Sequence, residues 1–93
     1  MNYVHVSRSP GHTLDDYERV LQQIGSAPIA GRASHHAGLV DGTLVIVDVW
    51  SSRADADRFA AERLFPAFEK AGVAPDASVE ITAFEAVTEG VRA

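Results

Sequence analysis

Hydrophobic positions along the chain follow two spacings. Apolar side chains that alternate with polar ones, or form short unbroken runs, indicate strands, whereas apolar positions three and four residues apart indicate helices. The elements predicted in chain order are a strand at residues 3–7, a helix at 13–24, strands at 33–40 and 43–50, a helix at 52–71 and a strand at 78–87.

Short polar motifs mark the predicted helix starts. Thr13 is followed three residues later by Asp16, and Ser52 is followed by Asp55. Such pairs satisfy the free amide groups of a first helical turn. Pro66 lies inside the second helix and lacks an amide hydrogen, so we expect the helix to kink or divide there.

The Asp41-Gly42 pair between two apolar runs predicts a tight hairpin, because both positions of a type I′ turn need a positive φ. The element order is therefore β-α-β-β-α-β, without a linker, in a single domain over residues 1–93. Residues 88–93 are expected to form a frayed tail. Two helices cover one face of a four-stranded antiparallel sheet, which is the ferredoxin-like α+β arrangement.

The hairpin register places His35 opposite Asp48 and Ala33 opposite Trp50. Directly opposed residues share one face of a sheet. Leu44 and Ile46 then lie on the same face as Asp48 and Trp50, and the first strand adds Tyr3 and His5 to that face.

An unbroken row of valines suits packing against helices. We therefore expect Val45, Val47 and Val49, with Val4 and Val6, to face the helices, and we expect His36 to point the same way. The Asp48 row is too apolar for bare solvent and should line a cavity on the uncovered side of the sheet, where a second subunit would close it.

Composition narrows the classes of function. The chain has 93 residues, 46% of them hydrophobic, a net charge of -5 and no cysteine. Scattered basic residues argue against nucleic-acid binding, and the missing cysteines exclude disulfides and thiolate metal sites. The sequence has no signal-peptide pattern and no run long enough to cross a membrane, so we expect a cytoplasmic protein.

Three segments resemble one known group. "LDDYERV" (14–20), "DGTLVIVDVWSS" (41–52) and "RFAAERLFPAFEKAG" (58–72) are similar to the small antibiotic-biosynthesis-monooxygenase-like proteins of the dimeric α/β-barrel superfamily. The resemblance covers about residues 2–88. It implies a homodimer that packs sheet against sheet, a small-molecule pocket at the sheet face, and activities that range from cofactor-independent monooxygenases and haem-degrading enzymes to cyclases and isomerases.

Candidate site residues follow from the register. His35, oriented by Asp48, is a candidate general base or acid, although the pair could equally be structural and only fix the register. Trp50 is a candidate stacking platform for a planar ligand or, alternatively, interface packing. The remaining predicted substrate-contact residues are His5, Tyr3, Ile46 and Leu44.

Other polar residues are expected to have no functional role: His36 and Arg63 are expected to be structural, and His12 is expected to be exposed in the loop before the first helix. His5, His35 and Asp48 could form a three-ligand metal set, but no ligand spacing in the sequence requires one. Neither predicted helix carries a proximal histidine for haem, and nucleotide-binding motifs are absent. We therefore predict no metal and no cofactor.

Three functions remain open. The first is a cofactor-independent monooxygenase of secondary metabolism that acts on a hydrophobic, aromatic or polyketide-type substrate. The second is a cyclase or isomerase that uses the same acid–base pair without oxygen. The third is a non-catalytic dimeric protein that binds a small molecule.

Overall fold

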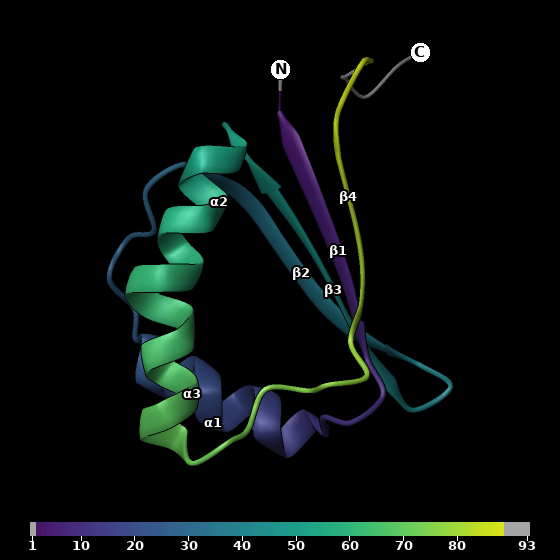
Figure 1. Cartoon of the computed structure of the whole chain (residues 1–93), viewed down its shortest axis with the longest axis vertical. Helices are drawn as coiled ribbons and strands as arrows, with labels where there is room; N and C mark the ends of the chain where they lie inside the picture. Colours follow the sequence, from purple (N-terminus) through teal and green to yellow (C-terminus); the bar gives the residue numbers. More distant parts are fainter. Residues whose placement is uncertain (1, 89–93) are drawn as a thin grey trace.

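The computed structural model describes residues 2–88 and has the predicted ferredoxin-like α+β architecture. Its strands are β1 (Tyr3–Ser9), β2 (Arg32–Val40), β3 (Thr43–Trp50) and β4 (Glu80–Glu85), arranged as one antiparallel sheet in the order β2-β3-β1-β4. The helical layer covers one face of this sheet (Figure 1). Of the predicted tail at residues 88–93, residues 89–93 lie outside the described residues.

Helix α1 (Leu14–Ile24) begins and ends where the sequence predicts. The Thr13 side chain accepts a hydrogen bond from the Asp16 amide, and the Asp16 carboxylate accepts one from the Thr13 amide, so the capping box is complete. The amide of Gly25, the C-cap, donates to the Leu21 carbonyl. Arg63 donates to carbonyls at and beyond this end of α1, including that of Ile24, which is a structural role as predicted.

The second helical stretch divides before Pro66. It runs as α2 (Arg53–Phe59), a π-helical segment η1 (Ala60–Leu64) and α3 (Phe65–Ala71), and the three form one continuous rod (Figure 1). A proline ring clashes with the carbonyl four residues earlier in an α-helix. The wider π turn relieves that clash, and the Phe65 amide donates to the Ala60 carbonyl five residues back.

The compact core lies between helices α1 and α3 rather than across the whole sheet. Val20, Ala67 and Val73 are its buried centre. At the other end of the rod, Trp50 packs against Phe59, with ring centroids 5.2 Å apart. The helices therefore touch each other or the end of β3, and they leave space over the middle of the sheet.

The hairpin and its register are confirmed. Asp41 and Gly42 both have positive φ, 49° and 81°, as a type I′ turn requires. His35 pairs with Asp48, as predicted. The register then breaks: Arg32, not Ala33, lies opposite Trp50, because Ala33 is the extra residue of a β-bulge. The prediction that Ala33 faces Trp50 is therefore wrong.

The predicted assignment of the two sheet faces is also wrong. Trp50 contacts Phe59 of α2 and His35 contacts Tyr17 of α1, so the row that contains Asp48 faces the helices. The valine row, with Val4 and Val6 from β1, forms the uncovered face; His36 shares that face and is exposed. We call this uncovered side the valine face. Its side chains are only partly buried because no element of residues 2–88 packs on them.

None of the helices within residues 2–88 combines the length and apolar character that crossing a membrane requires.

Candidate functional site

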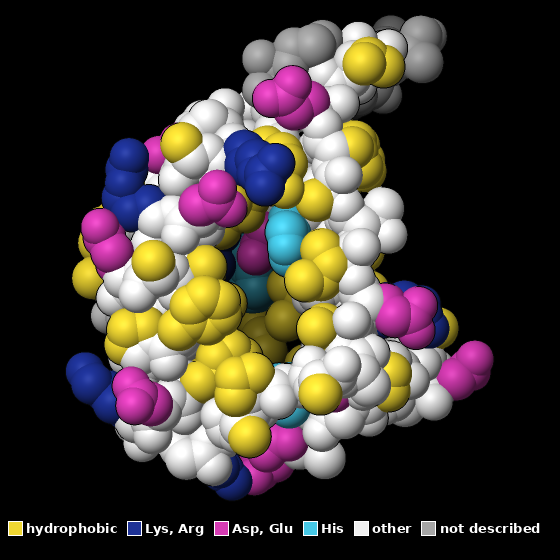
Figure 2. Space-filling view, viewed as in Figure 1, with side chains coloured by type: hydrophobic (Ala, Val, Ile, Leu, Met, Phe, Trp, Pro, Cys, Tyr) yellow, Lys and Arg dark blue, Asp and Glu magenta, His cyan; other side chains and the backbone are white. Residues whose placement is uncertain are grey.

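The space between the sheet and the helices is a cavity of about 240 Å³. Strands β1, β2 and β3 supply its floor, and α1, α2 and α3 supply its walls. In Figure 2 the hollow is rimmed by hydrophobic side chains, with histidine and acidic side chains visible inside it. This volume lies below the roughly 300–1,000 Å³ of sites for drug-sized ligands, so it suits a compact ligand of one or two rings.

Three polar side chains form a chain of hydrogen bonds inside this cavity. His35 of β2 bonds through Nδ1 to the carboxylate of Asp48 on β3. Its other ring nitrogen, Nε2, lies 2.7 Å from the hydroxyl of Tyr17 on α1. The Tyr17 and His35 rings are close to parallel, at 11°. We call these three residues the relay.

The direction of the two hydrogen bonds follows from their chemistry. An ionised carboxylate only accepts, so the Nδ1 atom of His35 carries the proton. In the neutral imidazole, Nε2 is then an acceptor and the Tyr17 hydroxyl donates to it. A carboxylate on one ring nitrogen makes the other nitrogen more basic, as in hydrolytic triads.

The relay is partly shielded from water. The side chains of His35 and Asp48 are 22% and 13% exposed. Burial raises the pKa of the Tyr17 phenol, the negative charge of Asp48 raises it further, and the positive charge of Arg32 lowers it. Tyr17 therefore stays protonated at neutral pH and can both donate and accept within the cavity.

Some of the predicted substrate-contact residues line the cavity, and others do not. His5, Ile46 and Leu44 line the cavity, as does the His35–Asp48 pair. Tyr3 lies opposite Trp50 on the same face and is not among the lining residues. A stacking role for Trp50 is not supported, because the side chain is 2% exposed and packed beneath α2.

Two polar residues of the cavity were missed from the sequence. Tyr17 lies in the predicted helix at residues 13–24 and was not predicted to reach a cavity, although a buried tyrosine hydroxyl usually needs a polar partner. Arg32 lies just before the predicted strand at 33–40 and was not predicted to reach it either, because the bulge that turns it inward leaves no mark in the hydrophobic pattern.

Two further polar residues that line the cavity, His12 and Asp76, form hydrogen bonds to neighbouring loops. His12 bonds through Nε2 to the Ala74 carbonyl at 2.7 Å. Asp76 accepts from Gly11 and from Ser78, and the Ser78 hydroxyl is the main cause that lowers the pKa of Asp76. These contacts join the loops before α1 and β4, so they are structural.

No group of three histidine or carboxylate side chains within residues 2–88 is arranged to hold a metal ion. In particular, His5, His35 and Asp48 all reach the cavity but do not form such a set.

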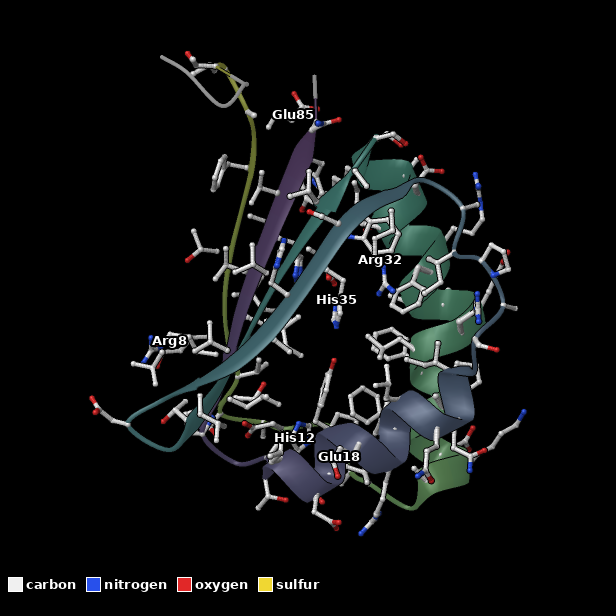
Figure 3. All side chains as sticks on the ribbon, turned by 180° about the vertical axis from the view of Figure 1, so that it is seen from behind. Arg8, His12, Glu18, Arg32, His35 and Glu85 are labelled. Carbon is white, nitrogen blue, oxygen red and sulfur yellow. The ribbon has the colours of Figure 1, made fainter. Side chains whose placement is uncertain are left out.

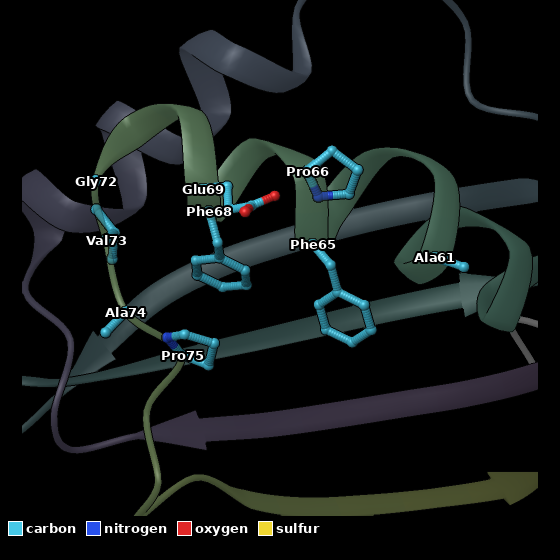
Figure 4. Close-up of a pocket in the computed structure, with 9 residues that line it drawn as sticks. All are labelled: Ala61, Phe65, Pro66, Phe68, Glu69, Gly72, Val73, Ala74 and Pro75. Carbon is cyan, nitrogen blue, oxygen red and sulfur yellow. The ribbon is translucent and has the colours of Figure 1, made fainter.

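Aromatic side chains of α3 form the apolar side of the cavity. Phe65 and Phe68 point from the helix toward the strands (Figure 4). Phe65 is 57% exposed, which places a large apolar surface at the mouth of the cavity. The same two rings border a second, shallower groove along α3 and the turn after it, whose lining contains one charged residue, Glu69.

Solved structures resemble this chain closely in fold but only distantly in sequence. No protein-family model matches the chain, and no curated protein is a significant match. SnoaB, a cofactor-independent oxygenase from Streptomyces nogalater, is 18% identical, with a TM-score of 0.68 over 99% of this chain and 98% of that chain. A candidate antibiotic biosynthesis monooxygenase from Chloroflexus aurantiacus is 14% identical, with a TM-score of 0.63 over 96% and 98%.

A dimeric ferredoxin-like protein of unknown function from Jannaschia sp. is also 14% identical, with a TM-score of 0.63 over 92% of this chain and 100% of that chain. This chain shares their fold. The resemblance noted in the sequence is therefore confirmed at the level of architecture. Identities this low carry the fold and not the reaction, so the chemistry has to be argued from the cavity.

Proposed function

We propose that the chain is a small enzyme that moves a proton on a hydrophobic, aromatic or polyketide-type substrate held between the sheet and the helices. The observation that carries this proposal is the relay of Tyr17, His35 and Asp48 in the wall of an apolar cavity. A hydroxyl, an imidazole and a carboxylate in this order are a complete device for general acid–base catalysis.

In the proposed proton path, the Tyr17 oxygen accepts a proton from an acidic C–H or O–H of the substrate. Tyr17 simultaneously gives its own proton to Nε2 of His35. The imidazolium that forms is stabilised by the adjacent Asp48 carboxylate. The substrate is left as a carbanion or enolate inside a cavity with apolar walls.

In the monooxygenase form, the carbanion transfers an electron to dioxygen and the resulting radicals combine to a peroxide. Loss of water then leaves a carbonyl at the former CH₂ carbon, so that one oxygen atom enters the product and the other leaves in water. The fold shared with a cofactor-independent oxygenase supports this outcome. The apolar cavity would contribute orientation and desolvation.

The second candidate is an isomerase or cyclase that uses the same relay without oxygen. This candidate is favoured because Tyr17 and His35 can each accept a proton and donate it again, so the proton can return to a different atom of the substrate. The third candidate is a non-catalytic binding protein, which an absence of turnover together with ligand binding would favour.

We further propose a homodimer formed through the valine face. Val45, Val47 and Val49 form an apolar row there, and Phe84 of β4, which lies opposite Val4 of β1 on the same face, is 48% exposed. The fold shared with a dimeric ferredoxin-like protein supports this assembly. The cavity lies on the opposite side of the sheet, so each subunit would hold a whole relay.

Proton transfer can be tested without knowing the natural substrate. The probe is 2-tetralone, a two-ring ketone with an acidic CH₂ group, whose exchange of hydrogen for deuterium in D₂O is followed by proton NMR. The chain should accelerate exchange, and His35→Ala should lose about 100-fold of that acceleration. Tyr17→Phe should lose at least about as much, because it removes the oxygen that accepts the substrate proton.

The matched control is His36→Ala. This neighbouring histidine lies on the valine face, so its removal should leave the exchange rate unchanged. Equal rates for His35→Ala and wild type would contradict the proposal. Oxygen uptake with the same ketone then separates the two reactions: uptake that depends on His35 supports the monooxygenase, whereas exchange without uptake supports the isomerase or cyclase.

A further inference from the structure

We infer that Arg32 is a specificity-determining residue that binds an ionised carboxylate of the ligand, so that the substrate class is aromatic or polyketide-type acids. The inference deepens the proposed function by naming the ligand group.

The bulge decides which side of the sheet Arg32 occupies. His35 points into the cavity, so strict alternation would put Ala33 on the cavity side and Arg32 on the valine face. The extra residue shifts the pairing, and Arg32 lies opposite Trp50, on the helix-facing side. Figure 3 shows Arg32 and His35 pointing into the same enclosed space. Bulges that re-aim one side chain are common beside active sites.

Inside the cavity, the guanidinium group has an aromatic neighbour but no ion-pair partner among the described residues. Its central carbon lies 5.8 Å from the ring centroid of Phe59. Within residues 2–88 no carboxylate forms an ion pair with it. By contrast, Arg19, Arg53 and Arg58 each pair with an aspartate one turn away on the same helix.

Arg32 is also close to the relay. Its charge acts on the Tyr17 hydroxyl, and both residues line the same cavity as His35. A planar guanidinium matches a carboxylate through two parallel hydrogen bonds. Walls of phenylalanine and aliphatic side chains suit the rings of such a ligand. A carboxylate held at Arg32 would therefore leave the ring system beside Tyr17.

The experiment compares two ligands of the same shape, 2-naphthoate and 2-naphthamide, by isothermal titration calorimetry at neutral pH. Wild type should bind the carboxylate about 10-fold more tightly than the amide. Arg32→Met should weaken binding of 2-naphthoate by about the same factor and leave 2-naphthamide within twofold. Arg32→Lys should recover only part of the loss, because a point charge cannot reproduce the fork.

The matched control is Arg8→Met, which removes the same charge from an exposed arginine that points away from the helices (Figure 3). It should leave both affinities unchanged. Equal weakening of both ligands in Arg32→Met would assign the residue to packing on Phe59 and overturn the inference. The inference would also be overturned if the wild type bound neither ligand at millimolar concentration, or bound both with the same affinity. Binding needs no turnover, so His35→Ala should keep the carboxylate preference even if the proposed reaction fails.

Discussion

At the residue scale, the titration of Tyr17 reports the charges around the relay. Burial raises its pKa first, then Asp48 raises it and Arg32 opposes the rise. We therefore expect Asp48→Asn to move the Tyr17 pKa down toward the usual value and Arg32→Met to move it further up. Ultraviolet titration of tyrosinate measures both changes, with Tyr17→Phe to identify the transition.

The sign of the linked stability follows from the same shift. Since folding raises the pKa of Tyr17, the contribution of its protonated phenol is fully present below about pH 10, the unfolded value. That contribution is lost as the pH rises through the higher folded value. A Tyr17 that titrates below the usual tyrosine value of about 10, or is insensitive to Asp48→Asn, would contradict the geometry of the relay.

At the scale of elements, the start of α2 depends on one carboxylate. Asp55 accepts from the hydroxyl groups of Ser51 and Ser52, and these bonds lower its pKa. A lowered pKa stabilises the fold above the unfolded value of about 4 and is lost as the pH falls through the folded value. Asp55→Asn should therefore lower the melting temperature more at pH 7 than at pH 3.

The control for this prediction is Asp57→Asn, an exposed carboxylate of the same helix that pairs with Arg53. It should change the melting temperature at pH 7 much less than Asp55→Asn does. Thermal unfolding followed by circular dichroism at the two pH values decides the point. Equal losses at both pH values for Asp55→Asn would show that the hydrogen bonds of the ionised form do not stabilise α2.

Elements whose signals are local were predictable from the sequence. The capping box at Thr13 and the Asp41-Gly42 turn act through hydrogen bonds and dihedral angles of neighbouring residues, and both are confirmed. Pro66 marked the division of the second helix for the same reason. The bulge at Ala33 was not predictable, because it depends on how the start of β2 meets β3 in space.

At the scale of the whole molecule, the hydrophobic pattern gave the register of the His35–Asp48 pair but the wrong side of the sheet. A row of valines was expected to be the core, and a mixed row was expected to be the outer face. In this fold the helices pack mainly on each other and stand away from the middle of the sheet, so polar side chains fit beneath them. The apolar row lies on the uncovered face, where the proposed partner subunit would bury it.

The proposed dimer predicts a simple response to charge on that face. Val47 lies in the middle of the valine row, so Val47→Asp should convert a dimer into a monomer because an unpaired carboxylate is costly to bury. Light scattering after size exclusion gives the mass, against 9.9 kDa for one chain. Leu39→Asp, an exposed position on the helix-facing side, is the control and should leave the mass unchanged.

If a relay built on His35 lies inside a ligand cavity beneath the helices, a bound ligand should perturb His35 and spare His36. A long-range proton–nitrogen NMR spectrum of the histidine side chains, recorded with and without 2-naphthoate, measures both effects. We predict that His35 carries its proton on Nδ1 and that the ligand shifts its Nε2 resonance while His36 stays unchanged. A proton on Nε2, or a ligand that shifts His36 and spares His35, would contradict the proposed relay.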